Sequence, residues 1–340
     1  RGNVVAVISD GTRVLGLGDI GPAASIPVME GKSALYKRFG NIDAIPIVID
    51  TKDKDEFIRT VQLLEKSFAG INLEDISSPK CYDIEDELKK TMNIPVFHDD
   101  QHGTAIAALA ALLGALKVAE KKLEDVKIVV NGAGAAGTAI ARLILEAGAN
   151  PKNMTVLNSK GILYDNGKRD RVQCELLTKV NPDNKQGTLE DAICGADVLI
   201  GCSAPGVFNC EALRTMADKS IVFAMANPVP EIMYDEAKDK GVFIYGSGRS
   251  DMPNQVNNSS VFPGLFRGAL DVRARQINEE MKLAAAYALA DFATSENSDP
   301  NHIVVDVFDP RVPMAVAKAV AKAAIESGVA RTTELPEQYK

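Results

Sequence analysis

A glycine-rich turn between a buried strand and a helix limits the possible folds of this chain more than any other feature. The apolar strand predicted over residues 126–130 leads through Asn131 into Gly132-Ala133-Gly134-Ala135-Ala136-Gly137, and a helix is predicted over residues 137–146. The first glycine allows a tight turn, the second lets the backbone approach a pyrophosphate, and the third permits close packing of helix on strand. Many glycine turns are only structural. The strand before this one and the helix after it favour a dinucleotide site formed by these six residues.

The end of the next predicted strand bears on which dinucleotide binds. An acidic residue there would bind the ribose 2′-hydroxyl of NAD, but this chain has Asn158-Ser159-Lys160. Lys160 could instead meet the 2′-phosphate of NADP, as could Lys168 or Arg169 nearby. We therefore expect Asn158, Ser159 and Lys160 to be cofactor-binding residues and NADP to be favoured over NAD. A solvated loop lysine is the alternative interpretation of Lys160.

Strands and helices alternate along the chain, which predicts parallel sheets with helices on both faces. We expect an α/β protein with an N-terminal α/β domain for substrate and metal over residues 1–102. A Rossmann-type doubly wound NAD(P)-binding domain is expected over residues 103–312, followed by a C-terminal helix over residues 313–340. Predicted strands cover residues 4–8, 13–17, 44–49 (as a buried strand), 69–73, 94–97, 126–130, 154–158, 198–201, 221–224 and 242–245. Predicted helices cover residues 27–39, 56–67, 84–91, 104–120, 137–146 and 313–327.

Charge and cysteine content bear on the partners and the compartment. The formal net charge of −8 argues against nucleic acid as a partner. The five cysteines are odd in number and form no C-x-x-C pair, so we expect reduced thiols in a cytoplasmic protein. The longest apolar stretch, residues 105–116, is too short to span a bilayer, and we expect no membrane partner.

Two pairs of carboxylates follow predicted strands. Glu74 and Asp75 come after residues 69–73, and Asp99 and Asp100 come after residues 94–97. Four carboxylates in one pocket would repel one another unless a divalent cation lay among them, and hard oxygen ligands select Mg²⁺ or Mn²⁺. His98 and His102 flank the second pair, so a zinc site is the alternative. Beside a dinucleotide turn, a metal pocket of this kind suggests redox chemistry on a small hydroxy acid.

Several longer motifs occur in an order that resembles the malic enzyme family in its short prokaryotic-type form. The resemblance extends over most of the chain and implies oxidation of L-malate by NAD(P)⁺ with decarboxylation to pyruvate. The motifs are residues 10–21 (DGTRVLGLGDIG), 27–32 (PVMEGK), 73–75 (LED), 98–104 (HDDQHGT), 226–228 (ANP) and 257–264 (NNSSVFPG).

The resemblance also implies roles for individual residues. Glu74, Asp75 and Asp100 match the metal ligands of the family. Lys32 matches the lysine that takes the proton from the malate C2 hydroxyl, and Asp99 matches the aspartate that relays it. Lys37 is a rival for the lysine, and a solvent-exposed helix residue is the alternative reading of Lys32.

Substrate contacts are implied in the same way. Arg13 matches an arginine that clamps a malate carboxylate in bidentate fashion. Asn227 and Asn258 match asparagines that hydrogen-bond the substrate, and Asn227 is expected beside the cofactor as well. An exposed loop arginine and a simple Asn-Pro turn are the alternatives for Arg13 and Asn227.

One motif of the family has no match in these residues. The family's general acid is a tyrosine in a Tyr-Thr-Pro-Gly-like motif upstream of the first strand, and Tyr36, Tyr82 and Tyr164 stand in other contexts. We expect that tyrosine in a segment before Arg1, and the resemblance implies a homodimer. Two other functions remain open: an NAD(P)-dependent 2-hydroxy acid dehydrogenase without decarboxylation, and a non-catalytic dinucleotide-binding module.

Overall fold

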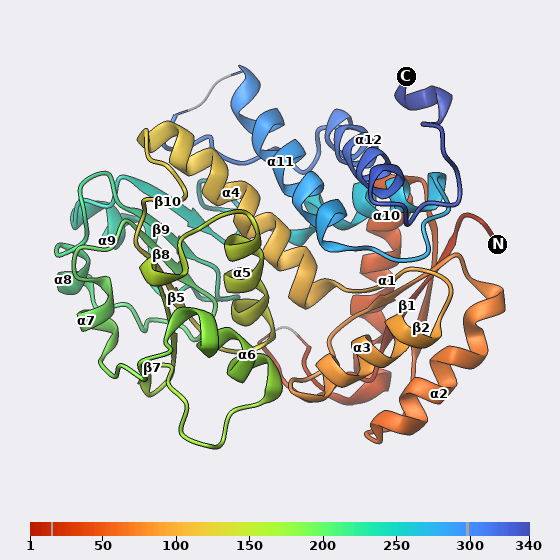
Figure 1. The fold of residues 1–340 in the computed structure, drawn as a ribbon, viewed down its shortest axis with the longest axis horizontal. Helices are drawn as coiled ribbons and strands as arrows, with labels where there is room; N and C mark the ends of the chain where they lie inside the picture. Colours follow the sequence, from red (N-terminus) through yellow and green to blue (C-terminus); the bar gives the residue numbers. More distant parts are fainter. Residues whose placement is uncertain (15, 297–298) are drawn as a thin grey trace. The chain divides into compact units, whose positions relative to one another are not determined.

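The chain forms two compact units in a computed structural model that describes residues 1–14, 16–296 and 299–340 (Figure 1). The first unit combines Arg1–Ile106 with Asn258–Leu289 and Asp306–Lys340, and the second combines Ala107–Asn257 with Ala290–Val305. This grouping differs from the expected segments, because residues 258–289 and 306–340 pack with the N-terminal part. Aromatic packing explains the difference: Phe266 lies edge-on to both Tyr36 and Phe97 in the core of the first unit.

The first unit is built on a parallel sheet with the strand order β2-β1-β3-β4. Its strands are β1 (Val4–Ser9), β2 (Asp43–Val48), β3 (Gly70–Leu73) and β4 (Val96–His98). The register pairs Ile8 with Leu73 and Leu73 with His98, so the carboxyl ends of β1, β3 and β4 lie side by side. The strand order reverses between β1 and β3. In open α/β sheets, ligands bind outside the carboxyl ends of the strands at such a point.

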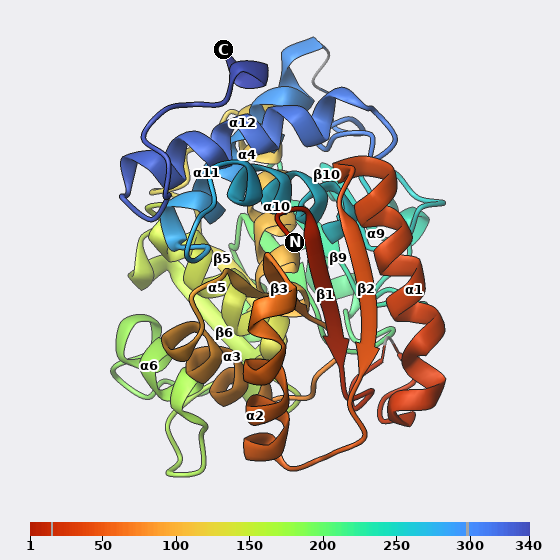
Figure 2. The same ribbon diagram turned by 90° about the vertical axis from the view of Figure 1, so that its right-hand side faces the viewer.

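Helices cover both faces of this sheet, as the right-handed connections of parallel strands require. Figures 1 and 2 show α1 (Gly21–Gly40) on one face, and α2 (Lys54–Leu64) and α3 (Lys80–Thr91) on the other. The helix α10 (Phe262–Asp271) packs on α1 and on α12 (Arg311–Glu326). Neither α10 nor α11 (Glu279–Glu296) was predicted from the sequence.

Two predictions for the first unit are wrong. Residues 44–49 were expected to form a buried strand, but β2 is the outer strand of the sheet and Ile45 is 46% exposed. Pro46 fits such a place, because proline in sheets is confined to edge strands and bulges. Residues 13–17 were expected to form a strand, but the described part forms only an isolated bridge between Val14 and Gly18; Leu15 lies outside the described residues.

The second unit is a doubly wound sheet with the order β10-β9-β8-β5-β6-β7. The order reverses between β5 and β8, as in dinucleotide-binding folds, and this confirms the predicted Rossmann-type class. Only β7 runs antiparallel within the described sheet. The strands are β5 (Ile128–Asn131), β6 (Met154–Asn158), β7 (Gly161–Ile162), β8 (Val198–Gly201), β9 (Ile221–Ala224) and β10 (Ile244–Ser247). The helices between them are α5 (Ala135–Glu146), α6 (Arg171–Val180), α7 (Leu189–Ile193), α8 (Cys210–Leu213) and α9 (Tyr234–Asp239).

A long apolar helix follows β4. A five-residue π-helical turn, Asp99–Gly103, continues directly into α4 (Thr104–Ala119). The resulting 21-residue segment, with a mean hydropathy of 1.5, is long and apolar enough to cross a membrane, contrary to the expectation from residues 105–116. Within the protein, 72% of an 18-residue apolar stretch of this segment is buried. A mostly apolar helix with this burial has the properties of a core helix.

Candidate functional site

The carboxylates predicted to bind metal meet at the point where the strand order of the first sheet reverses. Glu74 and Asp75 directly follow β3, and Asp99 and Asp100 directly follow β4. Glu74 donates its backbone N–H to Ile8 in β1, which continues the sheet geometry into the site. Parallel pairing of β3 with β4 therefore brings together two acidic pairs that are 25 residues apart in the sequence.

Three of the carboxylates have the geometry of a cation site. In Glu74, Asp75 and Asp100, one ligand oxygen from each lies within 4.8 Å of the others; this is the one such group among the described residues, and it includes no histidine. Asp75 has a left-handed backbone, with φ of 54°, and its N–H donates to Asp100 Oδ2 at 2.7 Å. Aspartate tolerates this conformation better than most residues. The all-oxygen set fits Mg²⁺ or Mn²⁺ better than zinc.

Lys32 lies beside this group on the buried side of α1. Its ammonium is 2.9 Å from Glu74 Oε1, forms a shorter ion pair with Asp99 Oδ2, and lies 4.3 Å from the ring centre of Phe262. The side chain is 8% exposed, so the reading of Lys32 as a solvated helix residue is wrong. The rival Lys37 is 58% exposed and pairs with Asp43 at 2.8 Å, away from these carboxylates.

The pKa values of the ionisable groups in this site are shifted by burial and by the neighbouring charges. Burial raises the pKa of Glu74 above its ordinary value, and it raises the pKa of Asp99 and that of Asp100 to about 6. Burial alone would lower the pKa of the Lys32 ammonium, but Asp99, Glu74 and Asp100 raise it above its ordinary value. One lysine thus faces several acids. A dication among the carboxylates would neutralise the excess negative charge.

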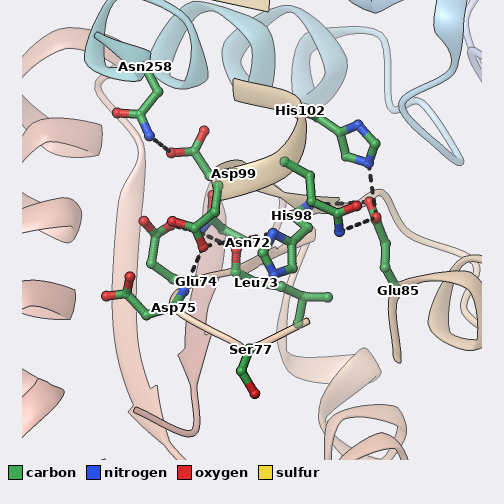
Figure 3. Close-up of polar contacts among 12 residues, drawn as sticks. Asn72, Leu73, Glu74, Asp75, Ser77, Glu85, His98, Asp99, His102 and Asn258 are labelled. Atoms are coloured by element: carbon green, nitrogen blue, oxygen red, sulfur yellow. Dashed lines mark hydrogen bonds and ion pairs between the residues drawn. The ribbon is translucent and has the colours of Figure 1, made fainter. Parts of the chain in front are cut away.

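Asp99 is held from two sides. Its Oδ2 accepts a hydrogen bond from the amide of Asn258 at 2.6 Å, as Figure 3 shows. The same oxygen pairs with Lys32. Its Oδ1 lies over Gly103, where an added Cβ would be only 1.9 Å from that oxygen. The structure therefore brings the predicted residues Lys32, Asp99 and Asn258 together, and any side chain at position 103 would displace the Asp99 carboxylate.

A buried hydrogen-bond chain behind Glu74 could not be anticipated from the motifs. Tyr36 donates its hydroxyl to Asn72 Oδ1 at 2.8 Å, and Asn72 donates its amide to Glu74 Oε2, also at 2.8 Å. Burial raises the pKa of Tyr36 well above its ordinary value, so the phenol stays neutral. Tyr36 thus orients a carboxylate through Asn72, in keeping with its different sequence context.

Glu85 in α3 is a further buried acid that sequence reasoning missed. It accepts a hydrogen bond from the His102 ring at 2.9 Å, as Figure 3 shows. Burial lowers the pKa of His102 to about 3, so the ring is neutral. One sequence signal could have found this residue: Glu85 has the i+4 and i−3 spacing from Cys81 and Leu88 that places it on the apolar face of its helix.

The glycine turn of the second unit has the form expected of a dinucleotide site. It connects β5 to α5, with Gly134 directly before the helix and Gly132 at φ of 135°. A Cβ on Gly137 would lie 1.7 Å from the carbonyl oxygen of Gly132, whereas a Cβ on Gly134 would meet nothing within 4 Å. Gly137 is thus required for packing, and the open space over Gly134 leaves room for a phosphate group.

The remaining predicted residues occupy two loops of the second unit and one of the first. Asn158 ends β6 and accepts a hydrogen bond from the backbone N–H of Lys160 at 2.8 Å, leaving the lysine exposed. Asn227, in the second unit, donates to the carbonyl of Gly248 at 3.4 Å. Arg13 has an exposed side chain, but its N–H donates to the carbonyl of Asp75 at 3.0 Å. Its loop therefore borders the carboxylate group.

A Rossmann-type unit and a unit with a buried lysine among carboxylates define a class, the NAD(P)-dependent oxidoreductases of two α/β units. Within that class, comparisons with known proteins identify one family for both units. The family described as "Malic enzyme, N-terminal domain" matches residues 2–89, and "Malic enzyme, NAD binding domain" matches residues 101–325. The chain belongs to the malic enzyme family.

Relatives and solved structures agree over nearly the whole chain. The bifunctional malic/malolactic enzyme of Bacillus subtilis is 52% identical over 99% of this chain and 82% of its own length. The NADP-dependent malic enzyme of Escherichia coli is 50% identical over 97% of this chain but only 45% of its own length. The malic enzyme of Pyrococcus horikoshii has a TM-score of 0.94 at 48% identity, covering 97% of this chain and 78% of that one.

Proposed function

We propose that this chain performs the oxidative decarboxylation of L-malate to pyruvate and CO₂, with NAD(P)⁺ as the hydride acceptor and a divalent ion in the first unit. The observation that carries the proposal is the buried Lys32, in contact with Glu74 and Asp99 beside the carboxylates of Asp75 and Asp100. Burying a cation and several carboxylates costs desolvation free energy, and buried ionisable groups of this kind cluster at functional sites.

Glu74, Asp75 and Asp100 are the residues that would hold Mg²⁺ or Mn²⁺, since they offer hard oxygen atoms within ligand distance of one another. When bound there, the ion supplies polarisation of the malate C2 oxygen and offsets the carboxylate charge that keeps Lys32 protonated. Asn72 keeps Glu74 oriented through its hydrogen bond to Oε2.

Lys32 and Asp99 form the path for the proton of the C2 hydroxyl. Lys32 takes the proton, and Asp99 receives it through the contact between Nζ and Oδ2. Asn258 donates to the same carboxylate oxygen, which fixes the direction in which the acid points. General acid–base groups must be held within hydrogen-bond reach of the proton they move, and these contacts provide that constraint.

Substrate binding in the first unit uses a neutral amide and a guanidinium. Asn258 donates to a malate carboxylate oxygen, and Arg13 clamps one carboxylate from the loop after β1. That loop is stabilised by Asp10, whose Oδ1 accepts hydrogen bonds from the N–H and the hydroxyl of Thr12 at 3.1 and 2.6 Å. Arginine suits the role because its planar group pairs with both oxygens of a carboxylate.

We also propose that NADP⁺ is preferred over NAD⁺. The support is that β6 ends at Asn158 and is followed two residues later by the exposed Lys160, with no acid at the position where NAD-specific folds bind the ribose hydroxyl. Changing Lys160→Glu should lower kcat/KM for NADP⁺ by at least about tenfold, the effect of roughly 1.4 kcal/mol, and spare NAD⁺. An unchanged NADP⁺/NAD⁺ ratio would reject Lys160 as the selecting residue.

The overall reaction is tested by following malate-dependent reduction of NADP⁺ with Mn²⁺ and measuring the products. Pyruvate and CO₂ in equal amounts support the proposal. Oxaloacetate without CO₂ indicates a dehydrogenase that does not decarboxylate, and lactate indicates the second activity in the name of the Bacillus subtilis relative. NADP⁺ binding without turnover indicates a non-catalytic module. Light scattering on the same sample tests the proposed homodimer.

A further inference from the structure

The acidic residues Asp99 and Asp100 lie on a turn that needs its own support. The π-helical turn Asp99–Gly103 is wider than an α-helical turn, and such turns occur mostly as short insertions near functional sites. The conformation of this turn orients the Asp100 side chain toward the other cation-site carboxylates and the Asp99 side chain toward Lys32. Groups that hold the turn from behind therefore bear directly on the site.

Glu85 contacts this turn on both sides of the acidic pair. Its Oε1 accepts from the backbone N–H of His98 at 3.3 Å, and its Oε2 accepts from the Gln101 amide at 3.2 Å and from His102 Nε2 at 2.9 Å. Lys89 in the same helix completes the set with an ion pair at 2.6 Å. Glu85 is only 3% exposed, and its carboxylate meets donors from the segments just before and just after the acidic pair.

The second nitrogen of His102 fixes which way that ring donates. Lys282 Nζ lies 3.1 Å from His102 Nδ1 and 2.8 Å from Glu279 Oε1. A lysine ammonium has donors and no acceptor, so Nδ1 must accept and Nε2 must carry the proton toward Glu85. The order of the contacts is therefore Lys282 to His102 to Glu85, and from Glu85 to the turn.

We propose that Glu85 is a positioning residue for the cation site, with His102 and Lys282 fixing the direction of its hydrogen bonds. The proposal rests on the proposed metal-dependent function. A buried carboxylate on the apolar face of α3 costs more than a leucine unless its oxygens are satisfied. The contacts given above satisfy them with donors just before the turn, on the turn and on Lys89 of α3, so the acid holds the turn in place.

The test is calorimetric titration of the metal-free full chain with Mn²⁺ in the wild type and in Glu85→Gln. Glutamine keeps the shape of the Glu85 side chain but replaces one oxygen by an N–H₂ donor. In the wild type, both carboxylate oxygens accept hydrogen bonds from donors. Loss of partners that orient metal ligands typically costs 10- to 100-fold in metal affinity, and we expect a loss of about this size. The matched control is Glu87→Gln in the same helix, and NADP⁺ binding should be unchanged in both variants.

A second pair of variants separates geometry from charge. Leucine and glutamine are both uncharged, so His102→Leu and His102→Gln differ in hydrogen bonding and not in charge; leucine removes the donor to Glu85 and glutamine retains one. We expect His102→Leu to bind Mn²⁺ at least about tenfold more weakly and His102→Gln to recover most of the loss. These two variants test the positioning role of Glu85 if Glu85→Gln does not fold.

The outcomes distinguish the two proposals. Wild-type affinity in folded Glu85→Gln, or in both His102 variants, overturns the positioning role. Failure of the wild-type chain itself to bind Mn²⁺ instead overturns the proposed metal-dependent function.

Discussion

The contact between Asp99 and Gly103 allows a quantitative prediction about the chemistry. In Gly103→Ala the new Cβ would lie 1.9 Å from Asp99 Oδ1 and 2.8 Å from its Cγ, whereas ordinary contact begins at 3.4 Å. The carboxylate must therefore retreat by about 1.5 Å, and a displacement of about 1 Å at a catalytic group can cost about 100-fold in rate. We expect kcat for malate-dependent NADP⁺ reduction to fall by about 100-fold.

The assay is steady-state turnover at saturating malate, NADP⁺ and Mn²⁺, with NADP⁺ binding and thermal unfolding measured on the same protein. The matched control is Gly31→Ala, one residue before Lys32 in α1, because a Cβ there would meet nothing within 4 Å. Alanine in a helix interior stabilises relative to glycine by about 0.5–1 kcal/mol, so the control should fold at least as well as the wild type. A folded Gly103→Ala protein with kcat within about threefold of the wild type, a loss of under 1 kcal/mol, would refute the argument.

Three further predictions concern the rest of the chain. Gly137→Ala should lower both the thermal midpoint and the affinity for NADP⁺, because its Cβ would lie 1.7 Å from Gly132 O. Gly134→Ala should lower only the affinity for NADP⁺, measured by calorimetry. Equal losses of thermal midpoint in the two variants would contradict this. Mn²⁺ at 100 times its dissociation constant should stabilise the first unit by about 2.7 kcal/mol and raise its midpoint by roughly 5–10 °C. Asp100→Asn should abolish most of that rise, and a persistent rise would place the ion elsewhere. At pH 8 an alkylating reagent should modify the exposed Cys174 far faster than Cys202, because burial raises the pKa of Cys202 to about 12, leaving at least about 100-fold less thiolate than an ordinary thiol. Mass spectrometry measures both rates, and similar rates would show that Cys202 is more accessible than its burial indicates.

The sequence predicted those parts of the fold that rest on local pattern. Apolar runs bounded by glycine or acidic residues located β1, β3, β5 and β8 because parallel strands are buried on both faces. The run at residues 44–49 has the same composition, yet it forms the outer strand β2. Strand order depends on connections between distant segments, which a local run of residues does not contain.

The residues of the site also divide into those that the sequence could predict and those that depend on tertiary packing. The acids after β3 and β4 could be placed together because consecutive strands end at one edge of a parallel sheet. The hydrogen bonds from Tyr36 to Asn72, and from Lys282 through His102 to Glu85, join segments up to 180 residues apart and depend on packing. The helix α10 was missed because Gly264 and Gly268 weaken its helical signal; both glycines instead allow close approach to α12, where a Cβ would lie within 2.7 Å of backbone oxygens of Pro313 and Ala317.

The outer strand β2 has a consequence for how the protein behaves at high concentration. Asp43 and Ile49 donate their N–H groups to Asn3 and Ser9, so the alternate positions, including Pro46, point their nitrogens away from the sheet. Proline has no N–H to offer there, and an incoming strand from a neighbouring molecule would find the middle of this edge without a donor. The proline costs the native ladder nothing while opposing intermolecular strand pairing, so replacing it with valine would leave the fold intact and increase its tendency to aggregate.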